Sequence, residues 1–355
     1  MRGLLLAGGH GTRLRPLTYT GNKHMLPIAN KPMLLYGLEH LRSAGITDVG
    51  LVLGPVKEGV RELLGDGSKF GVRLTYIEQP EPKGLAHAVM ISKHYLVGEP
   101  FVMYLGDNLL KEGVSRFKKI FEEDGLDCAV GVTPVSNPSN FGIVELRNGR
   151  IVSLVEKPNR PKSNMALIGV YVFGPKVFDA IRDLTPSWRG ELEITDTIRL
   201  MIEQGRKVKA VEVQGWWKDT GRPEDLLEAN QLVLADLQTN IRGKLSKGSH
   251  FTGSVVLGKG TTTIGSVGIR GPAMIGERCS LGPNVHIGPY TSIGDECTLQ
   301  NVEVENSIIM KGCKIESGKK IVDSLIGSYS TIANGANVVP QGHRLVIGER
   351  SFAQL

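Results

Sequence analysis

Short apolar runs alternate with stretches of helical spacing over the first two thirds of the chain. The apolar runs predict buried strands at residues 4–7, 49–53, 74–77, 101–105 and 129–133. Apolar residues three and four apart predict helices at residues 32–44, 59–64, 85–93 and 114–123. This alternation favours an α/β domain with a mostly parallel sheet and helices on both faces. In such sheets, ligands bind at the carboxyl ends of the strands.

The pattern changes beyond residue 250, where an aliphatic residue followed by glycine recurs every six residues. A six-residue repeat is typical of a parallel β-helix, in which three repeats form one triangular coil. Cys279 and Cys297 occupy equivalent places one coil apart, so we expect stacked inward thiols that pack as small apolar groups. The regular repeats are Ile275-Gly276, Leu281-Gly282, Ile287-Gly288 and Ile293-Gly294, with looser ones from Leu257-Gly258 to Ile347-Gly348.

These two patterns define the domain organisation that we expect. The α/β domain would span residues 1–235, a linker residues 236–248, and the β-helix residues 249–355. Residues 224–240 have helical spacing and would connect the two domains. A coil stack exposes flat faces and an open end, so we expect a homo-oligomer formed through the β-helix.

The composition limits the kinds of binding partner and the cellular compartment that we expect. The net charge of +6 permits an anionic partner, but the longest basic runs are two lysines, so a nucleic-acid footprint is not expected. We expect no signal peptide and no membrane-spanning segment, because the apolar runs have only strand length. The four cysteines show no metal-ligand spacing, which favours reduced thiols in the cytoplasm.

The first predicted strand runs directly into a glycine-rich loop with two arginines. Gly8, Gly9 and Gly11 allow a sharp turn that brings backbone N–H groups against phosphate oxygens. Arg13 and Arg15 add forked positive charge. The loop matches neither the dinucleotide fingerprint nor the Walker loop, so by itself it indicates only an anion site.

Six motifs together make the chain resemble the sugar-phosphate nucleotidylyltransferases over essentially its whole length. Within them it is most similar to the long-form glucose-1-phosphate thymidylyltransferases. The resemblance implies a Rossmann-like nucleotidyltransferase domain followed by a left-handed β-helix of hexapeptide repeats. The motifs are LAGGHGTRLRPLT at 6–18, NKHMLPIANKPM at 22–33, LGDN at 105–108, EKP at 156–158, RGELEITD at 189–196 and WKDTG at 217–221.

The implied reaction joins dTTP to glucose-1-phosphate. A phosphate oxygen of the sugar attacks the α-phosphorus, which gives dTDP-glucose and releases pyrophosphate, as a deoxysugar route requires. The protein must mainly align two anions and neutralise the leaving group. No general base is needed, because the attacking phosphate is already ionised.

The resemblance also implies roles for individual residues. Gly8, Gly11, Thr12 and Arg13 would cradle the triphosphate, Lys23 would contact its α- and β-phosphates, and Gln79 and Gly84 would bind the base. Arg13, Lys23, Asp107 and Asp219 are the catalytic candidates, and Asp107 and Asp219 would hold Mg²⁺ together with substrate phosphates. The sugar-phosphate pocket would comprise Asn108, Gly142, Glu156, Lys157, Leu167 and Arg189.

Three alternatives stay open at this point. UTP could replace dTTP, and His24, where many shorter relatives carry glutamine, leaves nucleotide choice undecided. The β-helix could carry an acyltransferase activity, with His286 as the candidate base. A non-catalytic regulatory or assembly subunit is the third alternative. Such subunits tend to lose the loop arginine, the lysine or the aspartates, and all of these are present here.

Overall fold

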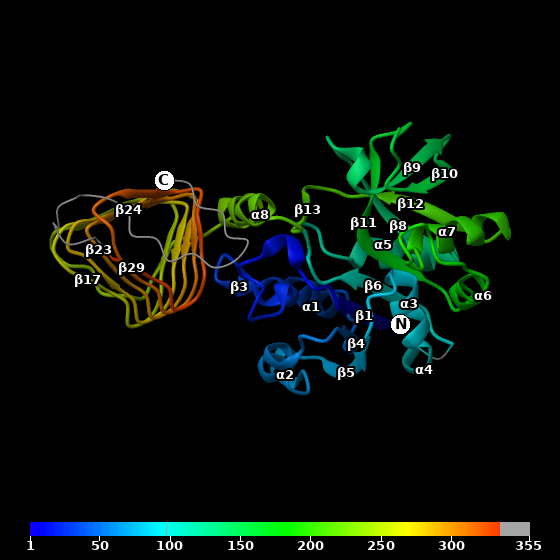
Figure 1. The fold of residues 1–355 in the computed structure, drawn as a ribbon, viewed down its shortest axis with the longest axis horizontal. Helices are drawn as coiled ribbons and strands as arrows, with labels where there is room; N and C mark the ends of the chain where they lie inside the picture. Colours follow the sequence, from blue (N-terminus) through cyan, green and yellow to red (C-terminus); the bar gives the residue numbers. More distant parts are fainter. Residues whose placement is uncertain (97, 334–355) are drawn as a thin grey trace. The chain divides into compact units, whose positions relative to one another are not determined.

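A computed structural model describes residues 1–96 and 98–333 of the chain (Figure 1). The chain forms two compact units whose boundaries are interleaved in the sequence. The first unit comprises Met1–Thr12, Gly21–Leu26 and Pro32–Thr220, and the second comprises Arg13–Thr20, Pro27–Lys31 and Gly221–Leu355. Within the described residues, no helix combines the length and apolar character needed to cross a bilayer.

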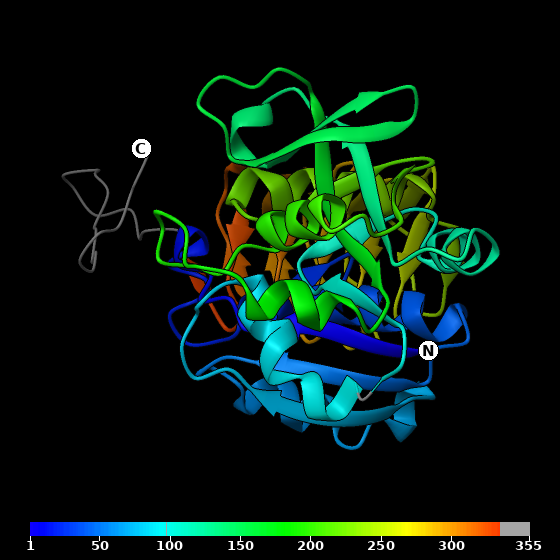
Figure 2. The same ribbon diagram turned by 90° about the vertical axis from the view of Figure 1, so that its right-hand side faces the viewer.

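The first unit is built on a nine-stranded mixed sheet. Its central strands β5, β4, β1 and β6 are parallel, and β1, β4 and β5 lie side by side in blue in Figure 2. β11 runs antiparallel to β6, β8 and β9, while β12 runs parallel to β8. The sheet strands are β1 (Arg2–Ala7), β4 (Asp48–Leu53), β5 (Arg73–Glu78), β6 (Phe101–Leu105), β8 (Cys128–Pro134), β9 (Gly142–Arg147), β10 (Arg150–Glu156), β11 (Met165–Phe173) and β12 (Val208–Glu212).

Helices and short elements complete this unit and its connections. All five predicted strands are confirmed, and so are the predicted helices, except that residue 93 begins a separate helix. The helices are α1 (Met33–Ser43), α2 (Glu58–Leu64), α3 (Leu85–Ile91), α4 (Lys93–Leu96), α5 (Ser115–Glu123), α6 (Val177–Arg182) and α7 (Ile194–Glu203). The short elements are η1 (Thr12–Leu14), η2 (Lys23–Met25), β2 (Pro27–Ile28), β3 (Lys31–Pro32), η3 (Ser68–Phe70), β7 (Asn108–Leu110), η4 (Pro138–Asn140) and β13 (Trp217–Asp219).

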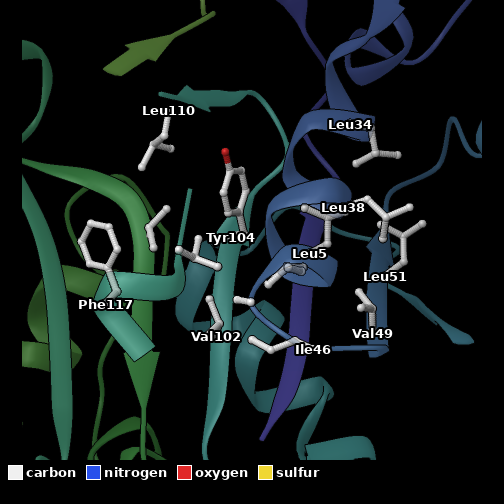
Figure 3. Close-up of a cluster of buried hydrophobic side chains, with 14 of the residues drawn as sticks. Leu5, Leu34, Leu38, Ile46, Val49, Leu51, Val102, Tyr104, Leu110 and Phe117 are labelled. Carbon is white, nitrogen blue, oxygen red and sulfur yellow. The ribbon is translucent and has the colours of Figure 1, made fainter. Parts of the chain in front are cut away.

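The central strands are apolar throughout because both faces of the sheet are buried. Successive strand residues point to opposite faces, so Leu5 of β1 joins one core cluster and Leu4 and Leu6 join the other. Figure 3 shows the first cluster, where Leu5 and Tyr104 lie near helix residue Leu38. The glycine loop and the turn after β6 therefore leave the core at the same, carboxyl edge of the sheet.

The second unit contains α8 (Pro223–Ala235) and a left-handed parallel β-helix, whose coils stack in yellow to orange in Figure 1. The helix predicted at 224–240 is shorter than expected, because residues 240–241 already pair with the first coil. One face has the order β14-β16-β19-β22-β25-β28, the second β15-β18-β21-β24-β27, and the third β17-β20-β23-β26-β29. These results confirm the fold class predicted from the repeats.

The β-helix strands are two to four residues long, as hexapeptide repeats require. They are β14 (Asn240–Ile241), β15 (Ser249–Thr252), β16 (Val255–Leu257), β17 (Thr262–Thr263), β18 (Val267–Arg270), β19 (Ala273–Ile275), β20 (Ser280–Leu281), β21 (Val285–Ile287), β22 (Thr291–Ile293), β23 (Thr298–Gln300), β24 (Val302–Glu305), β25 (Ile308–Ile309), β26 (Lys314–Glu316), β27 (Lys320–Val322), β28 (Leu325–Ile326) and β29 (Thr331–Ala333). The predicted repeat at Ile347-Gly348 lies outside the described residues.

The cysteines of the β-helix are buried free thiols. Cys279 and Cys297 point into the coil core, as predicted, and Cys313 continues the same stack. The Sγ atoms of Cys279 and Cys297 donate hydrogen bonds of 3.1 Å to backbone carbonyls of the following turn. The thiols thus satisfy backbone acceptors while packing as small apolar groups.

Candidate active site

Glycines let the loop after β1 pack closely against its neighbours. A Cβ on Gly8 would lie 3.1 Å from Oε1 of Gln79, and a Cβ on Gly54 would lie 2.4 Å from the carbonyl oxygen of Gly8. Gly11 has φ +64°, in the left-handed region that favours glycine. The loop backbone therefore lies directly beside the glutamine predicted to bind the base.

Lys23 lies against the same loop and pairs with a carboxylate. A Cβ on Gly9 would lie 3.0 Å from Cε of Lys23, so this glycine leaves the lysine room. The Lys23 ammonium donates a hydrogen bond to Asp107, and both side chains are mostly buried. Burial acts to raise the pKa of Asp107, but the Lys23 charge and hydrogen bond outweigh it and hold that pKa well below its usual range. The carboxylate is thus ionised.

Asp107 and Asp219 come together through the pairing of two short strands. Asp219, the last residue of β13, pairs with Asn108, the first residue of β7. The Asn108 amide donates to Asp107 at 3.1 Å and to Asp219 at 3.4 Å. One amide therefore holds both carboxylates.

The aspartate pair fits Mg²⁺ in its donor chemistry. This ion prefers oxygen ligands and commonly takes one or two carboxylates, with substrate phosphates and water in its other positions. Among the described residues there is no group of three or more histidine, cysteine, aspartate or glutamate side chains that could hold a metal ion. A bound nucleotide would thus have to complete the coordination.

Asn108 is itself fixed by two hydrogen bonds. Its Oδ1 accepts from the backbone N–H of Gly169 in β11 at 2.9 Å and from Nε1 of Trp217 at 2.7 Å. The side chain is buried, so its amide cannot rotate without losing these bonds. The sequence predicts Asn108 only as part of the sugar pocket, and it predicts neither this holding role nor the contribution of Trp217. The adjacency of Trp217 to Asp219 was the available signal.

His24 lies beneath the loop rather than on its surface. The side chain is buried, and Nδ1 lies 2.7 Å from Oδ1 of Asn22. Burial, helped by the Lys23 charge, lowers the pKa of His24 to about 3, so the imidazole is neutral. A Cβ on Gly106 would lie 3.1 Å from the His24 ring. This residue therefore supports the turn that carries Asp107.

The predicted base-binding residues are neighbours. Gln79 Nε2 donates to the carbonyl of Gly84 at 3.2 Å and lies 3.0 Å from Nδ1 of His87. Gly84 has φ +98°, and a Cβ there would lie 2.4 Å from the carbonyl oxygen of Leu192. Glycine is thus required at this start of α3. The Gln79 amide is held in place beside Gly8.

The residues predicted for the sugar meet around Gly142. A Cβ on this glycine would lie 3.1 Å from Oε2 of Glu156 and 3.3 Å from Cδ1 of Leu167. It would also lie 2.7 Å from the methyl group of Thr195, which the sequence analysis missed. Burial raises the pKa of Glu156, and the charge of Glu193 raises it further. Gly142 is therefore closely packed between Thr195, Glu156 and Leu167, which brings three of the residues predicted for the sugar together.

The two cations predicted near the sugar are both occupied by carboxylates. Arg189 lies 3.6 Å from Glu156, 2.8 Å from Glu191 and 3.3 Å from Glu193. Lys157 lies 3.7 Å from Glu156 and is partly exposed. Arg189 is therefore surrounded by negative charge, which makes Lys157 the better placed of the two to meet a phosphate.

Two members of the predicted phosphate cradle fall on either side of the unit boundary. Thr12 ends the first segment of the first unit, and its side chain is exposed. Arg13 begins the second unit, where a Cβ on Gly221 would lie 3.0 Å from its Nη2. Its guanidinium is exposed on that unit.

Comparison with known proteins identifies the family. The nucleotidyl transferase family matches residues 2–236, and the GMPPB C-terminal domain matches residues 263–351. The chain belongs to the nucleotidyl transferase family.

Two relatives match the chain over its whole length, and a solved structure matches about two thirds of it. A glucose-1-phosphate thymidylyltransferase from Streptomyces antibioticus is 45% identical over 100% of this chain and 99% of its own length. The low-salt glycan biosynthesis nucleotidyltransferase Agl11 from Haloferax volcanii is 46% identical over 100% of both chains. A solved structure from Bacillus anthracis, described as a glucose-1-phosphate thymidylyltransferase in complex with sucrose, has a TM-score of 0.63 and 36% identity, and covers 68% of this chain and 97% of that one. The predicted enzyme class is confirmed.

Proposed function

We propose that this enzyme transfers a thymidylyl group from dTTP to glucose-1-phosphate, giving dTDP-glucose and pyrophosphate. The observation that carries the proposal is the cluster of Lys23, Asp107, Asn108 and Asp219 beside the glycine loop. Gln79 lies against that loop, and Gly169, which fixes Asn108, shares β11 with Leu167 of the sugar pocket. The relatives with this name support the choice of nucleotide and sugar.

The chain's residues have separate tasks in this reaction. The loop amides and Thr12 would bind the triphosphate, and Arg13 would add positive charge. The Lys23 ammonium, held by Asp107, would move onto the phosphates when the nucleotide binds. Asp107 and Asp219 would hold Mg²⁺, which when bound offsets phosphate charge and makes the α-phosphorus more electrophilic. Members of this family generally use a divalent metal.

Different residues would recognise the nucleotide and the sugar phosphate. The Gln79 amide can donate to and accept from the edge of a pyrimidine. Glu156 would accept hydrogen bonds from sugar hydroxyls, and Lys157 would meet the sugar's phosphate. Gly142 and Leu167, which lie beside Glu156, would shape the pocket around the sugar.

Pyrophosphate release tests this proposal. We expect glucose-1-phosphate to be used with dTTP in preference to UTP, ATP, GTP and CTP, measured as kcat/KM. Asp107→Asn and Asp219→Asn should each lower kcat by about 100-fold or more, because a charged group at the reacting phosphates is lost. Asp124→Asn removes an exposed carboxylate that pairs with Lys209 and should leave kcat unchanged.

Other results would change the assignment. Equal or better use of UTP would make the enzyme a uridylyltransferase of the same mechanism. Full activity in both aspartate variants would remove these residues from the metal site. No turnover with any nucleotide would favour the non-catalytic subunit.

We further propose that the enzyme acts in the cytoplasm as a homo-oligomer formed through the β-helix. Free cysteines in both units suit a reducing compartment. The flat faces of the coils suit packing against further copies of the chain. Light scattering of the purified protein would give the mass of the assembly, and a monomer at micromolar concentration would contradict this proposal.

A further inference from the structure

One face of the β-helix carries two histidines that the transferase reaction does not use. His250 of β15 and His286 of β21 are both in register with Gly268 of β18, one from the coil on each side. All three therefore belong to one row that runs across the strands of this face. Since strand residues alternate in direction and the flanking Val267 and Ile269 are buried in the core, this row points outward.

Both imidazole rings reach into the space above the glycine. A Cβ on Gly268 would lie 2.9 Å from Nδ1 of His286 and 3.2 Å from Nε2 of His250. The two histidines are exposed, yet Gly268 between them is buried beneath their rings. A ring nitrogen of each thus approaches the same point from opposite sides. Neither ring has a hydrogen bond or ion pair with the described part of the chain.

On the same face, the gap above a second glycine, Gly288, is filled by a glutamate that pairs with an arginine. Gly288 continues β21, and a Cβ there would lie 2.8 Å from Cγ of Glu305. Arg270 lies 3.6 Å from that glutamate, so opposite charges pair beside this gap. Two imidazoles cannot pair in this way. Imidazole nitrogens are the side-chain ligands that zinc, nickel and copper ions prefer in proteins.

We propose that His250 and His286 bind one divalent transition-metal ion of the zinc, nickel or copper class above Gly268. Zn–N bonds are about 2.0–2.1 Å long, and the two ring nitrogens lie 2.9 Å and 3.2 Å from the Cβ position above Gly268. Water would complete the coordination, since the described residues contain no third histidine, cysteine or carboxylate close enough to form a cluster. The surrounding hollow, about 380 Å³, has room for those waters.

This site differs chemically from the aspartate site of the transferase. Imidazole nitrogens select zinc, nickel and copper, whereas carboxylates and phosphates suit magnesium. Excess Mg²⁺ can therefore occupy the oxygen-ligand sites during a titration without filling the histidine site. The proposal stands whether or not the nucleotide specificity proposed above is correct.

Titration of the full-length, EDTA-treated protein with Zn²⁺ in excess Mg²⁺ tests this inference. We expect one zinc site that weakens about tenfold or more in His250→Ala and in His286→Ala, because each variant removes one of two protein ligands. His94→Ala removes an exposed histidine from the first unit and should not change zinc binding. With Cu²⁺, the electron paramagnetic resonance spectrum should show two imidazole nitrogens.

Gly268→Ala tests the geometry of the site more specifically than removal of a histidine. It keeps both histidines and places a methyl group in the gap, so binding should fall by a similar factor. Circular dichroism and Mg²⁺-dependent pyrophosphate release should be unchanged in all of these variants, which shows that each still folds. Unchanged zinc affinity in the double variant His250→Ala/His286→Ala would overturn the proposal. Zinc affinity that falls in one of the two single variants and stays unchanged in the other would also overturn it.

Discussion

Glu156 combines burial with a position beside the predicted sugar pocket. Its pKa is raised, first by burial and then by the charge of Glu193. A raised pKa means that the carboxylate takes up a proton at a higher pH than an exposed glutamate does. The protonated form loses acceptor capacity for sugar hydroxyls. Sugar binding should therefore weaken as the pH falls into the acid range.

The expected result is a rise in KM for glucose-1-phosphate on acidification, starting above the ordinary glutamate pKa of about 4.3. KM for dTTP should not follow this rise. Glu156→Gln should weaken sugar binding by about tenfold at neutral pH, consistent with loss of a charged acceptor. The phosphate group of the sugar titrates in the same way with both proteins. The difference between their pH profiles of KM therefore gives the contribution of the Glu156 carboxylate. An identical pH profile in both proteins would exclude Glu156 as the titrating group.

At the level of elements, β7 and β13 set the distance between the two aspartates. Trp217 of β13 contributes through its Nε1 hydrogen bond to Asn108, and its ring contacts Phe141 edge to face. Trp217→Phe keeps an aromatic ring but removes the donor. Asn108 then keeps only the bond from Gly169, and its amide can rotate away from the carboxylates.

We expect Trp217→Phe to lower kcat by about 3- to 10-fold, which corresponds to one hydrogen bond of about 0.5–1.5 kcal/mol. Because the tryptophan acts through Asn108, the KM for Mg²⁺ should rise while the KM for glucose-1-phosphate stays near its original value. Trp216→Phe, which changes the neighbouring residue without touching Asn108, is the matched control. A purely structural role would instead lower the midpoint of unfolding and leave the Mg²⁺ dependence unchanged.

The elements of the chain differ in how far their sequence predicts them. β1 and β6 were predictable, because strands buried on both faces give continuous apolar runs. The β9–β10 hairpin was missed although Asn148-Gly149, both with positive φ, forms a two-residue turn between the strands. Only the first three residues of β9 and only Ile151 and Leu154 of β10 are buried, so neither strand has a long continuous apolar run.

The residues of the candidate site also differ in how far the sequence predicts them. Asp107 and Asp219 could be predicted because each lies at the end of a strand-like run and within a family motif. The hydrogen bonds from Asn108 to both carboxylates could not be predicted, because they depend on the pairing of β7 with β13, which lie more than a hundred residues apart in the sequence. The ion pairs of Arg189 with three carboxylates could not be predicted either, because the sequence shows which residues are charged but not which of them lie close together.

For the molecule as a whole, Asn230 of α8 connects segments that are remote in sequence. Its Oδ1 accepts from the Ala29 N–H and its Nδ2 donates to the Tyr290 carbonyl, each at 2.9 Å. The side chain is fully buried. One amide thus joins the N-terminal segment Pro27–Lys31, α8 and a coil of the β-helix, all within the second unit.

Asn230→Ala should destabilise the protein by about 1–3 kcal/mol, because it leaves the buried Ala29 N–H and the partly buried Tyr290 carbonyl unpaired. Urea unfolding followed by circular dichroism measures this loss. Gln231→Ala, which removes the neighbouring partly exposed bond to Asn306, should cost about 1 kcal/mol or less. Equal effects of the two variants would show that burial of Asn230 contributes nothing of its own.

The interleaving of the two units has a consequence for the order in which a ribosome can complete them. Residues 13–20 and 27–31 are made early, but the remainder of their unit, from residue 221 onward, is made last. Chains generally fold by domains as they emerge, yet here the loop between Gly8 and Lys23 passes through a unit that does not yet exist. Residues 13–20 and 27–31 can therefore complete their packing only after the residues from 221 onward have been made.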